Sequence, residues 1–390
     1  MKKVGLIGWR GMVGSVLLER MGEEKDFETF KAHFFTTSQK GMPAPQTGFS
    51  QHPHLQDAFA LSSLSEMDII VCCQGSDYTN QIWPQLKNIG WQGYWIDASS
   101  AMRMDTDSVI CLDPINGHII KSALDDGIKK FIGGNCTVSL LLLALGGLIR
   151  HGVVEWISSM TYQAASGGGA KHMKELLQQM NRLGQEGVSH HKESEQESIL
   201  AIDRRVTQVM QGDRFETQQF GVPLAGSLIP WIDTAAETGQ TREEWKAEAE
   251  GNKILQVSPR VPIDGICVRV GAMRSHSQGF TIKLTQDMPI STIEEIIASS
   301  NDWVHVVPNE PEATKKHLTP AAVSGTLSIP VGRIRKMSIG PEYITAFSVG
   351  DQLLWGAAEP LRRMLRLVIT HLDSSADYVN SNTVQKEEKC

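Results

Sequence analysis

The first third of the chain alternates short apolar segments with stretches of helical periodicity. Residues 11–21, for example, place apolar side chains at helical spacing directly after an apolar run and a glycine-rich turn. Interleaved strands and helices are typical of a parallel, doubly wound sheet, so we predict an α/β fold over about the first 135 residues. The predicted strands cover residues 2–8, 31–38, 67–75, 93–100, 108–116 and 129–135.

The pattern changes at Cys136. A long apolar helix is predicted over about 137–150. Further along, residues 261–284 alternate apolar and polar positions in the manner of antiparallel strands, and residues 303–308 add one more strand. The second part of the chain is therefore predicted to be an α+β domain.

The C-terminal part contains one more clear helical pattern, over 351–372. The segment 373–390 is rich in serine, asparagine, glutamate and lysine and is predicted to form a loose tail. A polar stretch at 187–198 is predicted to be an exposed excursion of the second domain, without an assigned role.

Composition and charge exclude some classes of partner. The chain has 390 residues, enough for two domains, and 41% hydrophobic with 21% charged residues is ordinary for a globular protein. A net charge of −7 argues against a nucleic-acid partner, which would need a basic face. The apolar run after Cys136 is shorter than the roughly 20 residues that span a bilayer, so no membrane partner is expected.

The cysteines and the N-terminus predict a cytoplasmic protein. Six cysteines without a CxxC pair fit reduced thiols better than a disulfide framework. The first residues superficially resemble a signal peptide, with two lysines followed by apolar residues, but Arg10 interrupts the apolar region. A strand, a turn and a helix explain this segment better.

A glycine-rich turn follows the first strand and leads into the first helix. Gly8, Gly11 and Gly14 would let the backbone approach a pyrophosphate, and the helix N-terminus would supply free N–H donors. The spacing is GxxGxxG rather than GxGxxG, so a tight turn without a ligand is the alternative. Its place in an alternating strand and helix pattern favours a Rossmann-like nucleotide-binding domain.

The end of the second strand indicates which nucleotide is bound. A residue that binds the ribose 2′-hydroxyl of NAD would be an aspartate or glutamate at the end of this strand, but residues 35–40 contain neither. Thr37 and Ser38 provide hydroxyl groups, and Arg10 can add a charge-assisted contact to a 2′-phosphate. This favours NADP over NAD, unless the hydroxyl residues only end the strand.

Cys136 stands at the predicted start of the long apolar helix. Asn135 can cap that helix, and a helix N-terminus lowers the pKa of a thiol below the roughly 8.5 of a free cysteine. The residue pattern agrees equally well with two interpretations of Cys136, a catalytic nucleophile and a buried residue that only fills space in the core (a filler). Filler is the better interpretation for the cysteines inside strand-like segments, which are Cys72, Cys73, Cys111 and Cys267.

A nucleophilic cysteine needs a partner for proton transfer, and His276 is the best candidate among twelve histidines. It lies close in sequence to Arg269 and Arg274, a grouping that suits a site for an anion, although a surface strand with ordinary charges is the alternative. The pair His190 and His191 suggests a metal, but no matching ligand spacing supports one, so no metal is expected.

Five motifs, in order along nearly the whole chain, resemble aspartate-β-semialdehyde dehydrogenases of the Gram-negative bacterial type. They are GWRGMVGS at 8–15, GGNCTVSLL at 133–141, YQAASGGGAKHM at 162–173, REEWK at 242–246 and VRVGAMRSHSQ at 268–278. The similarity continues through 349–365, while the polar stretch around 187–198 is more charged than the family pattern.

The resemblance implies an activity and a mechanism. Such enzymes reductively dephosphorylate L-aspartyl-4-phosphate to L-aspartate 4-semialdehyde with NADPH, on the route to lysine (through diaminopimelate), threonine and methionine. In the opposite direction, Cys136 would attack the aldehyde, a hydride would pass to NADP, and phosphate would open the resulting thioester. His276 would act as the acid/base that takes the thiol proton and handles the hemithioacetal oxygen.

The resemblance also assigns substrate and cofactor contacts. Gln163 would orient the substrate. Arg269 would bind its α-carboxylate and Glu243 its ammonium group. Arg103 and Lys246 would bind the phosphate. The positions that match cofactor contacts are Arg10, Gly11, Met12, Val13, Thr37, Ser38, Gln74, Ser166, Gly167 and Gln352.

The family architecture predicts an NADP-binding domain over 1–135, completed by the helix at 351–372, and a catalytic and dimerisation domain over 136–350. A homodimer is therefore implied by the resemblance.

Three other functions compete with this one. A reductase of the N-acetylglutamyl-phosphate type would use the same cysteine and histidine chemistry. Glu243 suits a free ammonium group, however, and an N-acetyl group would leave the Glu243 carboxylate unpaired. A non-catalytic NADP-binding regulator would not need Cys136, Gln163, Arg269 and His276 together. A thiol hydrolase would have no use for the glycine turn.

Overall fold

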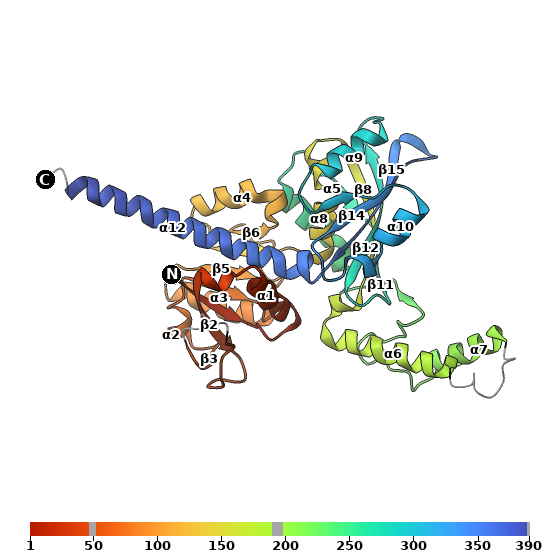
Figure 1. Cartoon of the computed structure of the whole chain (residues 1–390), viewed down its shortest axis with the longest axis horizontal. Coiled ribbons are helices and arrows are strands. Elements are labelled where there is room, and N and C mark those ends of the chain that lie inside the picture. The colour runs from red at the N-terminus through yellow and green to blue at the C-terminus, as the bar shows by residue number, and fades with distance from the viewer. Residues whose placement is uncertain (47–51, 189–197, 388–390) are drawn as a thin grey trace. The chain divides into compact units, whose positions relative to one another are not determined.

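The structure, a computed structural model, describes residues 1–46, 52–188 and 198–387 (Figure 1). The chain divides into two compact units. The first contains Met1–Ser139, Glu250–Gln256 and Leu353–Cys390, and the second contains Leu140–Ala249 and Val257–Gln352.

The first unit is built on a seven-stranded sheet in which every strand pair is parallel. The strand order is β3-β2-β1-β4-β5-β7-β6. All residues of β4, β5 and β7 are buried, as expected when both faces of a parallel sheet are covered. The predicted doubly wound α/β fold is confirmed. The strands are β1 (Lys2–Ile7), β2 (Phe30–Thr36), β3 (Gln56–Asp57), β4 (Ile69–Cys72), β5 (Tyr94–Asp97), β6 (Ser108–Cys111) and β7 (Lys130–Gly133).

Several predicted strands are shorter than expected, among them 67–75, 93–100 and 108–116. The segment 108–116 forms β6 only as far as Cys111, and helix α4 (Asp113–Asp125) begins two residues later. Pro114 is the reason, because proline suits the first turn of a helix, where its missing N–H leaves no bond unmade. The other helices of this unit are α1 (Met12–Glu23), α2 (Leu61–Leu64), α3 (Ser76–Asn88) and α12 (Glu359–Glu387), with short turns at η1 (Asp26–Glu28) and η3 (Leu354–Ala358).

The C-terminal helix α12 belongs to the first unit and contacts α1, α4 and the central strands of the parallel sheet (Figure 1). Leu361, Leu365 and Val368 are fully buried and follow one another at helical spacing, so they form its apolar face. The helix extends to Glu387, beyond the predicted end at residue 372, and the π-helical turn η3 precedes it.

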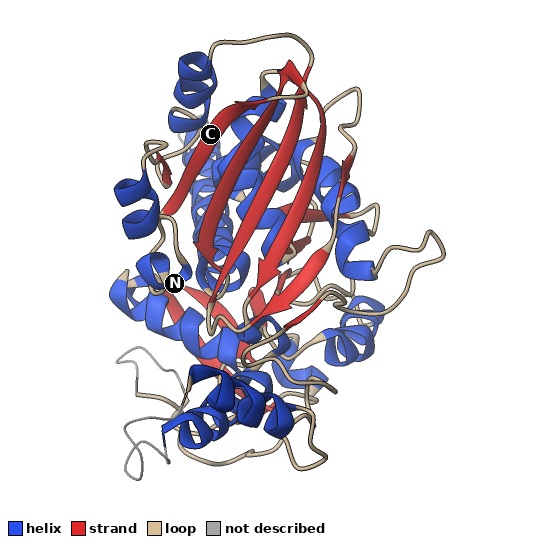
Figure 2. Ribbon diagram, turned by 90° about the vertical axis from the view of Figure 1, so that its right-hand side faces the viewer, coloured by secondary structure: helices blue, strands red, loops and turns tan. Residues whose placement is uncertain are grey.

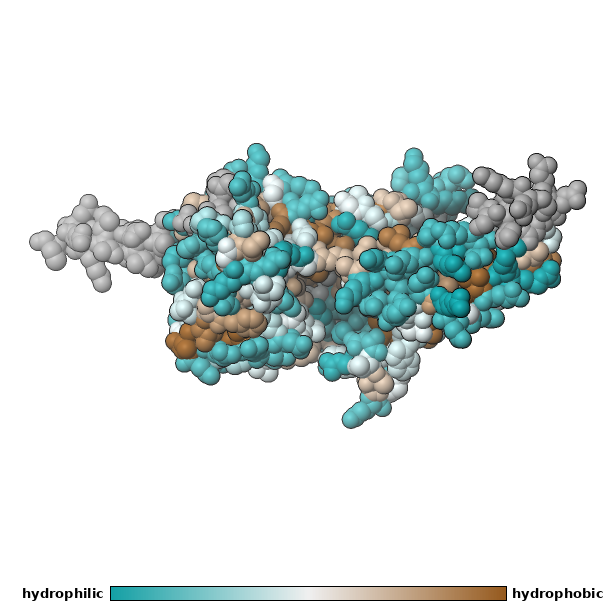
Figure 3. Space-filling view, turned by 90° about the horizontal axis from the view of Figure 1, so that it is seen from below, coloured by the Kyte–Doolittle hydropathy of each residue, from teal (hydrophilic) through white to brown (hydrophobic). Residues whose placement is uncertain are grey.

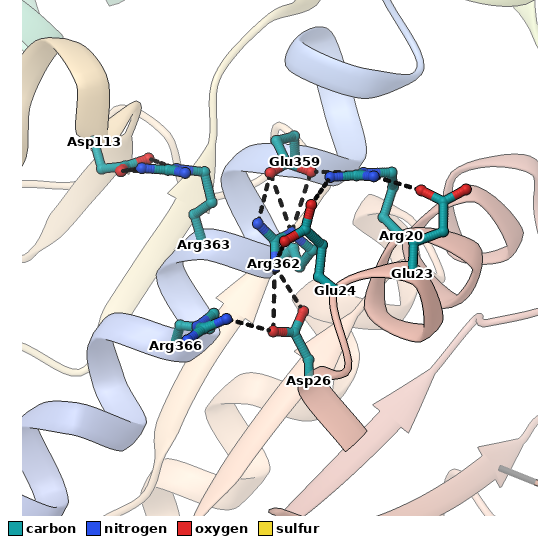
Figure 4. Close-up of polar contacts among 9 residues, drawn as sticks. All are labelled: Arg20, Glu23, Glu24, Asp26, Asp113, Glu359, Arg362, Arg363 and Arg366. Atoms are coloured by element: carbon teal, nitrogen blue, oxygen red, sulfur yellow. Dashed lines mark hydrogen bonds and ion pairs between the residues drawn. The ribbon is translucent and has the colours of Figure 1, made fainter. Parts of the chain in front are cut away.

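Buried ion pairs fix this helix to α1 and η1 (Figure 4). The Arg362 guanidinium donates to both carboxylate oxygens of Asp26, at 3.2 and 2.9 Å, and to Glu359 at 2.8 Å. Asp26 and Glu359 are each only 1% exposed. Arg366 reaches Asp26 at 3.2 Å and Arg20 reaches Glu359 at 3.2 Å, so each buried carboxylate has two cationic partners.

The second unit is built on an eight-stranded sheet with the order β13-β14-β15-β12-β8-β11-β9, in which β10 also pairs with β8. Among the long strands β8, β12, β15 and β14, each runs antiparallel to its neighbour in this order. The predicted α+β architecture is confirmed. The strands are β8 (Val154–Gln163), β9 (Leu228–Ile229), β10 (Ile263–Asp264), β11 (Cys267–Val270), β12 (Ser275–Leu284), β13 (Val304–Val306), β14 (Ile329–Met337) and β15 (Gly340–Asp351).

The segment 261–284 differs from the antiparallel pattern expected from its sequence. Both β10 and β11 run parallel to β8, and only β12 is antiparallel to it. Parallel pairing requires a long crossover connection, and the roughly hundred residues between β8 and β10 supply one. Alternation of apolar and polar residues does not distinguish the two directions.

The helices of the second unit include two that cross the boundary between the units. Helix α5 (Cys136–Arg150) begins in the first unit, and helix α8 (Arg242–Leu255) ends there. The others are α6 (Ala170–Val188), α7 (Ile199–Met210), α9 (Ile290–Ala298), α10 (Pro311–His317) and α11 (Pro320–Val323), with η2 (Ala165–Gly168) after β8. Most of the polar stretch at 187–198 lies outside the described residues.

One face of the second sheet is open. Burial alternates along β8, where Met160 and Tyr162 are 38% and 39% exposed while their neighbours in sequence are buried. Figure 2 shows the long strands side by side with no helix across this face.

Within the described part of the chain, no helix is both long enough and apolar enough to cross a membrane. The face shown in Figure 3 is mostly hydrophilic, with separate hydrophobic areas.

We predict that Arg362→Met lowers the free energy of unfolding by about 3–5 kcal/mol, because it leaves two buried carboxylates without their shared partner. Urea unfolding at pH 7 measures the change. Arg366→Gln is the matched control, since the Arg366 side chain is 51% exposed and its loss is expected to cost about 1 kcal/mol or less. Equal losses in the two variants would contradict the assignment of Arg362 as the central cation.

Candidate active site

The glycine turn follows β1 in the first unit and depends on two of its glycines. Gly8 has a φ of +73°, and a Cβ on it would lie 2.4 Å from the carbonyl carbon of Cys73. A Cβ on Gly14 would lie 2.4 Å from the Gly8 carbonyl oxygen. A side chain on Gly8 would therefore meet the backbone that follows β4, and one on Gly14 would meet the turn itself, so these glycines shape the turn.

A cavity of about 330 Å³ lies beside this turn. It is bordered by the loops that follow β1, β2 and β4, at the carboxyl ends of these strands, where doubly wound folds bind nucleotides. Predicted cofactor residues Arg10, Gly11, Thr37 and Gln74 line it, whereas Met12 and Val13 form the first turn of α1. The full lining is Gly8, Trp9, Arg10, Gly11, Phe35, Thr36, Thr37, Cys73 and Gln74.

Arg10 lines this cavity and contacts side-chain hydroxyl groups at the end of β2 and just after it. Its guanidinium contacts Thr36 Oγ1 at 3.4 Å, Ser38 Oγ at 3.3 Å and the side-chain amide oxygen of Gln39. The residues that line the cavity include no carboxylate. A cation surrounded by hydroxyl groups suits a phosphate monoester better than an unmodified ribose diol.

Cys136 is the first residue of α5, in the place that the Gly-Gly-Asn pattern predicts. The Asn135 side-chain oxygen accepts the N–H groups of Thr137 at 3.0 Å and Val138 at 3.2 Å, which is the geometry of an N-cap. Cys136 itself is half-buried and stands at the N-terminus of a helix.

The other described cysteines differ in environment. Burial raises the pKa of Cys73 and of Cys267 to about 12, and it raises the pKa of Cys72 and Cys111 well above the usual value. These four remain protonated near neutral pH and are poor nucleophiles, which agrees with the filler interpretation.

Arg103 lies in the loop after β5 and faces the turn that carries Cys136. Its Nε donates to the Gly133 carbonyl oxygen at 2.7 Å, and one terminal nitrogen donates to the Gly134 carbonyl oxygen at 3.2 Å. The other terminal nitrogen donates to the Glu250 carboxylate at 3.1 Å. The predicted phosphate ligand is thus held against the turn that leads to the predicted nucleophile, within the first unit.

Three predicted substrate residues meet in the second unit. Gln163, at the end of β8, donates its Nε2 to Glu243 Oε1 at 3.2 Å, and both side chains are buried. Lys246 donates to Glu243 Oε2 at 2.9 Å, one turn along α8. Lys246 also donates to Asp233 at 2.8 Å, a residue that the sequence analysis did not single out.

The charges in this cluster stabilise one another. Burial alone would lower the pKa of Lys246, but the Glu243 and Asp233 carboxylates outweigh it and raise this pKa. Lys246 is therefore cationic near neutral pH. Asp233 has a φ of +72°, a backbone conformation that only the structure shows, and no motif in the sequence singles this residue out.

Ala164 connects the two other predicted substrate and catalytic residues. Its carbonyl oxygen accepts from Arg269 at 2.7 Å, and its N–H donates to His276 Nδ1 at 3.0 Å. Because Nδ1 accepts this bond, a neutral His276 carries its hydrogen on Nε2. Burial, and then the nearby Arg269 charge, lower the pKa of His276 to about 3. His276 is thus a neutral hydrogen-bond donor at Nε2.

Gly167 permits this arrangement, because a Cβ on it would lie 2.7 Å from an Arg269 guanidinium nitrogen and 3.4 Å from the His276 ring. Ser166, next to it, accepts the Gln352 side-chain amide at 2.7 Å. Arg274, which the sequence groups with Arg269, instead pairs with Asp351 at 2.6 Å.

Comparison with known proteins agrees with the two-part fold described above. The family described as "Semialdehyde dehydrogenase, NAD binding domain" matches residues 3–123, and "Semialdehyde dehydrogenase, dimerisation domain" matches residues 145–355. Among solved structures, aspartate semialdehyde dehydrogenase from Francisella tularensis is 48% identical, with a TM-score of 0.89 over 94% of this chain and 100% of that chain.

More distant structures share the fold. Aspartate semialdehyde dehydrogenase II from Vibrio cholerae is 21% identical, with a TM-score of 0.76 over 95% of this chain and 99% of that one. Aspartate semialdehyde dehydrogenase with NADP from Candida albicans is 16% identical, with a TM-score of 0.62 over 95% and 99% of the two chains.

We predict that His276 remains neutral, with its hydrogen on Nε2, between about pH 5.5 and 8, because the pKa of about 3 lies far below this window. Nitrogen-15 NMR of histidine-labelled protein distinguishes protonated from unprotonated ring nitrogens, and His276→Asn identifies the resonance. A titration of this ring near pH 6.5, or a hydrogen on Nδ1, would contradict the geometry.

Proposed function

Because the chain belongs to the aspartate semialdehyde dehydrogenase family, we propose that it catalyses the NADP-dependent reductive dephosphorylation of L-aspartyl-4-phosphate to L-aspartate 4-semialdehyde. The reaction is reversible and belongs to the biosynthesis of lysine, threonine and methionine. The observation that carries this proposal is the capped helix start at Cys136, in a chain 48% identical over 94% of its length to such an enzyme.

Cys136 is the proposed nucleophile. The capped N-terminus of α5 favours the thiolate, which attacks the acyl carbon of the substrate while phosphate leaves, so that a thioester forms on the sulfur. In the opposite direction, phosphate opens the same thioester. The nicotinamide cofactor, when bound, supplies the hydride that takes the acyl group to the aldehyde level.

His276 is proposed to act on the oxygen of the reacting carbonyl. As a neutral ring with its hydrogen on Nε2, it donates a hydrogen bond to the oxygen on which negative charge develops. Accepting the thiol proton at the same nitrogen would require the opposite tautomer, whose Nδ1–H would meet the Ala164 N–H. Of the two tasks expected from the sequence, the contact with the oxygen is the one that this hydrogen bonding supports.

The remaining predicted residues bind the substrate. Arg269 suits the α-carboxylate, because guanidinium groups bind carboxylates through two parallel bonds. Glu243 is proposed to bind the ammonium group and Gln163, which is hydrogen bonded to it, to orient the substrate. Arg103 and Lys246, both cationic, are proposed to bind the phosphate.

NADP is the proposed cofactor, supported by the acid-free cavity and the hydroxyl groups around Arg10. Arg10 and Ser38 would contact the 2′-phosphate. The glycine turn and the first turn of α1 would bind the pyrophosphate. The proposed contacts are those expected from the sequence, namely Arg10, Gly11, Met12, Val13, Thr37, Ser38, Gln74, Ser166, Gly167 and Gln352.

We further propose a homodimer formed through the open face of the second sheet, which lies within the segment matched by the dimerisation domain. Aromatic side chains of β8 and β15 meet there across the intervening strand β12, since Tyr162 packs against Phe347 and Trp156 against Tyr343. An apolar face of this kind is suited to burial against a second copy.

A cytoplasmic location is proposed from the cysteines. The five in the described part of the chain are free thiols, as is usual in a reducing compartment.

The reaction is tested by mixing the protein with L-aspartate semialdehyde, phosphate and NADP⁺ and following the absorbance of reduced nicotinamide. We expect a phosphate-dependent rise with the native protein and a loss of at least about 10³-fold in Cys136→Ala, because the covalent step is removed. Cys111→Ala, which removes a buried thiol from the same unit, is expected to retain turnover.

Equilibrium binding of NADP⁺ to Cys136→Ala provides the control for folding and is expected to be close to that of the native protein. Substantial turnover in Cys136→Ala would exclude the thioester mechanism. No turnover in the native protein, with NADP⁺ bound, would exclude the reaction itself.

Arg10→Gln is expected to raise the KM for NADP⁺ by about 10-fold or more, as the loss of a charge-assisted hydrogen bond to phosphate requires. The KM for NAD⁺ is expected to change by less than about 3-fold, since the ribose diol makes no ionic contact with Arg10. Lys40→Gln is the matched control, because Lys40 is exposed nearby and pairs with Asp57. An equal effect of Arg10→Gln on both cofactors would remove Arg10 from the 2′-phosphate site.

A further inference from the structure

Glu250 is a buried carboxylate with two different partners in the first unit. It is 2% exposed, and it lies in the last part of α8. Oε1 accepts a guanidinium N–H of Arg103 at 3.1 Å, and Oε2 accepts the backbone N–H of Asn135 at 2.8 Å. Each carboxylate oxygen therefore holds a residue to which the proposed reaction gives a role, the phosphate ligand or the cap of the nucleophile helix.

Arg103 and Glu250 together bind three consecutive backbone groups. Arg103 donates to the carbonyl oxygens of Gly133 and Gly134, and Glu250 accepts the next N–H, that of Asn135. These groups form the turn between β7 and α5, and the following residue is Cys136. The ion pair thus fixes the backbone that leads directly into the proposed nucleophile.

The same contacts determine the direction of the Arg103 guanidinium. A guanidinium has five N–H donors in a rigid plane, and three are used by Gly133, Gly134 and Glu250. The directions of the other two, one on each terminal nitrogen, are then set as well, because the group is planar. A phosphate that binds Arg103 would use these two.

Lys253, one turn after Glu250 on α8, holds the backbone of the same loop. Its Nζ donates to the carbonyl oxygens of Arg103 and Asp105, each at 2.6 Å, and to Ser108 Oγ at 3.2 Å. The last turns of α8 therefore hold Arg103 at both its side chain and its main chain.

We propose that Glu250 is a positioning residue, which aims Arg103 at the phosphate and fixes the turn that carries Cys136. The proposal rests on the proposed function. Its chemistry is specific, since Arg103 and Asn135 each donate to a different carboxylate oxygen. A glutamine in the same position would place its NH2 group, which is a donor, against one of these two donors. Glu250 touches neither the reacting atoms nor the cofactor.

Glu250→Gln tests the proposal in the semialdehyde assay, with phosphate, semialdehyde and NADP⁺ varied in turn. We expect the KM for phosphate to rise by about 10-fold or more and kcat to fall by about 10²-fold, as displacement of reacting groups by about 1 Å can cause. The KM for NADP⁺ is expected to change by less than about 3-fold. A purely structural role would lower kcat through loss of folded enzyme and leave the phosphate KM unchanged, which would overturn the proposal.

Three further variants separate positioning from stability. Glu248→Gln makes the same change on the same helix at a side chain that is 46% exposed, and native phosphate dependence is expected. Glu250→Asp keeps the charge and both acceptor oxygens, so it is expected to fold and to show a smaller rise in the phosphate KM than Glu250→Gln. In the Arg103→Gln background, adding Glu250→Gln is expected to raise the phosphate KM by less than about 3-fold.

If Glu250→Gln does not fold, Glu250→Asp and the double variant decide the question. A native phosphate KM in Glu250→Asp together with fully additive effects in the double variant would overturn the proposal. Failure of the native protein to turn over the semialdehyde would instead overturn the proposed function, so the two failures are distinguishable.

Discussion

The first unit depends on the parallel pairing of its seven strands. In such a sheet the carboxyl ends of neighbouring strands meet at one edge, so the loops that leave them gather there whatever their separation in sequence. Strands β1, β2, β4, β5 and β7 end in this way. Their loops contribute, in that order, the glycine turn, Thr37 and Ser38, Gln74, the Arg103 loop, and Asn135 with Cys136. Burial of both faces of the sheet provides the rigidity that holds these loops in place.

Buried charges recur in this protein, and each has a partner that satisfies it. In the first unit, Arg362 with Asp26 and Glu359 holds the C-terminal helix, and Arg103 with Glu250 holds the turn before Cys136. Lys246 with Asp233 and Glu243 does the same in the second unit. An unpaired buried charge is costly, so such groups are defined in position by their partners. One helix, α8, supplies Glu243 and Lys246 from its first turns and Glu250 and Lys253 from its last.

His276 illustrates how the backbone can choose a chemical role. The N–H of Ala164 points at Nδ1, and a backbone N–H can only donate. The ring is thereby held as the tautomer with hydrogen on Nε2, while burial and Arg269 disfavour the imidazolium. The resulting group is a weak base and a good hydrogen-bond donor. A protein can thus stabilise a developing oxyanion without an additional charge in the site.

The sequence by itself determined the features that depend on neighbouring residues. The alternating strands and helices of about the first 135 residues, the glycine turn, the cap at Asn135 and the acid-free end of β2 follow from local patterns. The tertiary structure decided the partners of Glu250 and Asp233, the tautomer of His276 and the parallel direction of β11. Arg103 and Glu250 are 147 residues apart, and Ala164 and His276 are 112 apart. Pairing at such separations is set by how strands and helices pack, and no local periodicity records it.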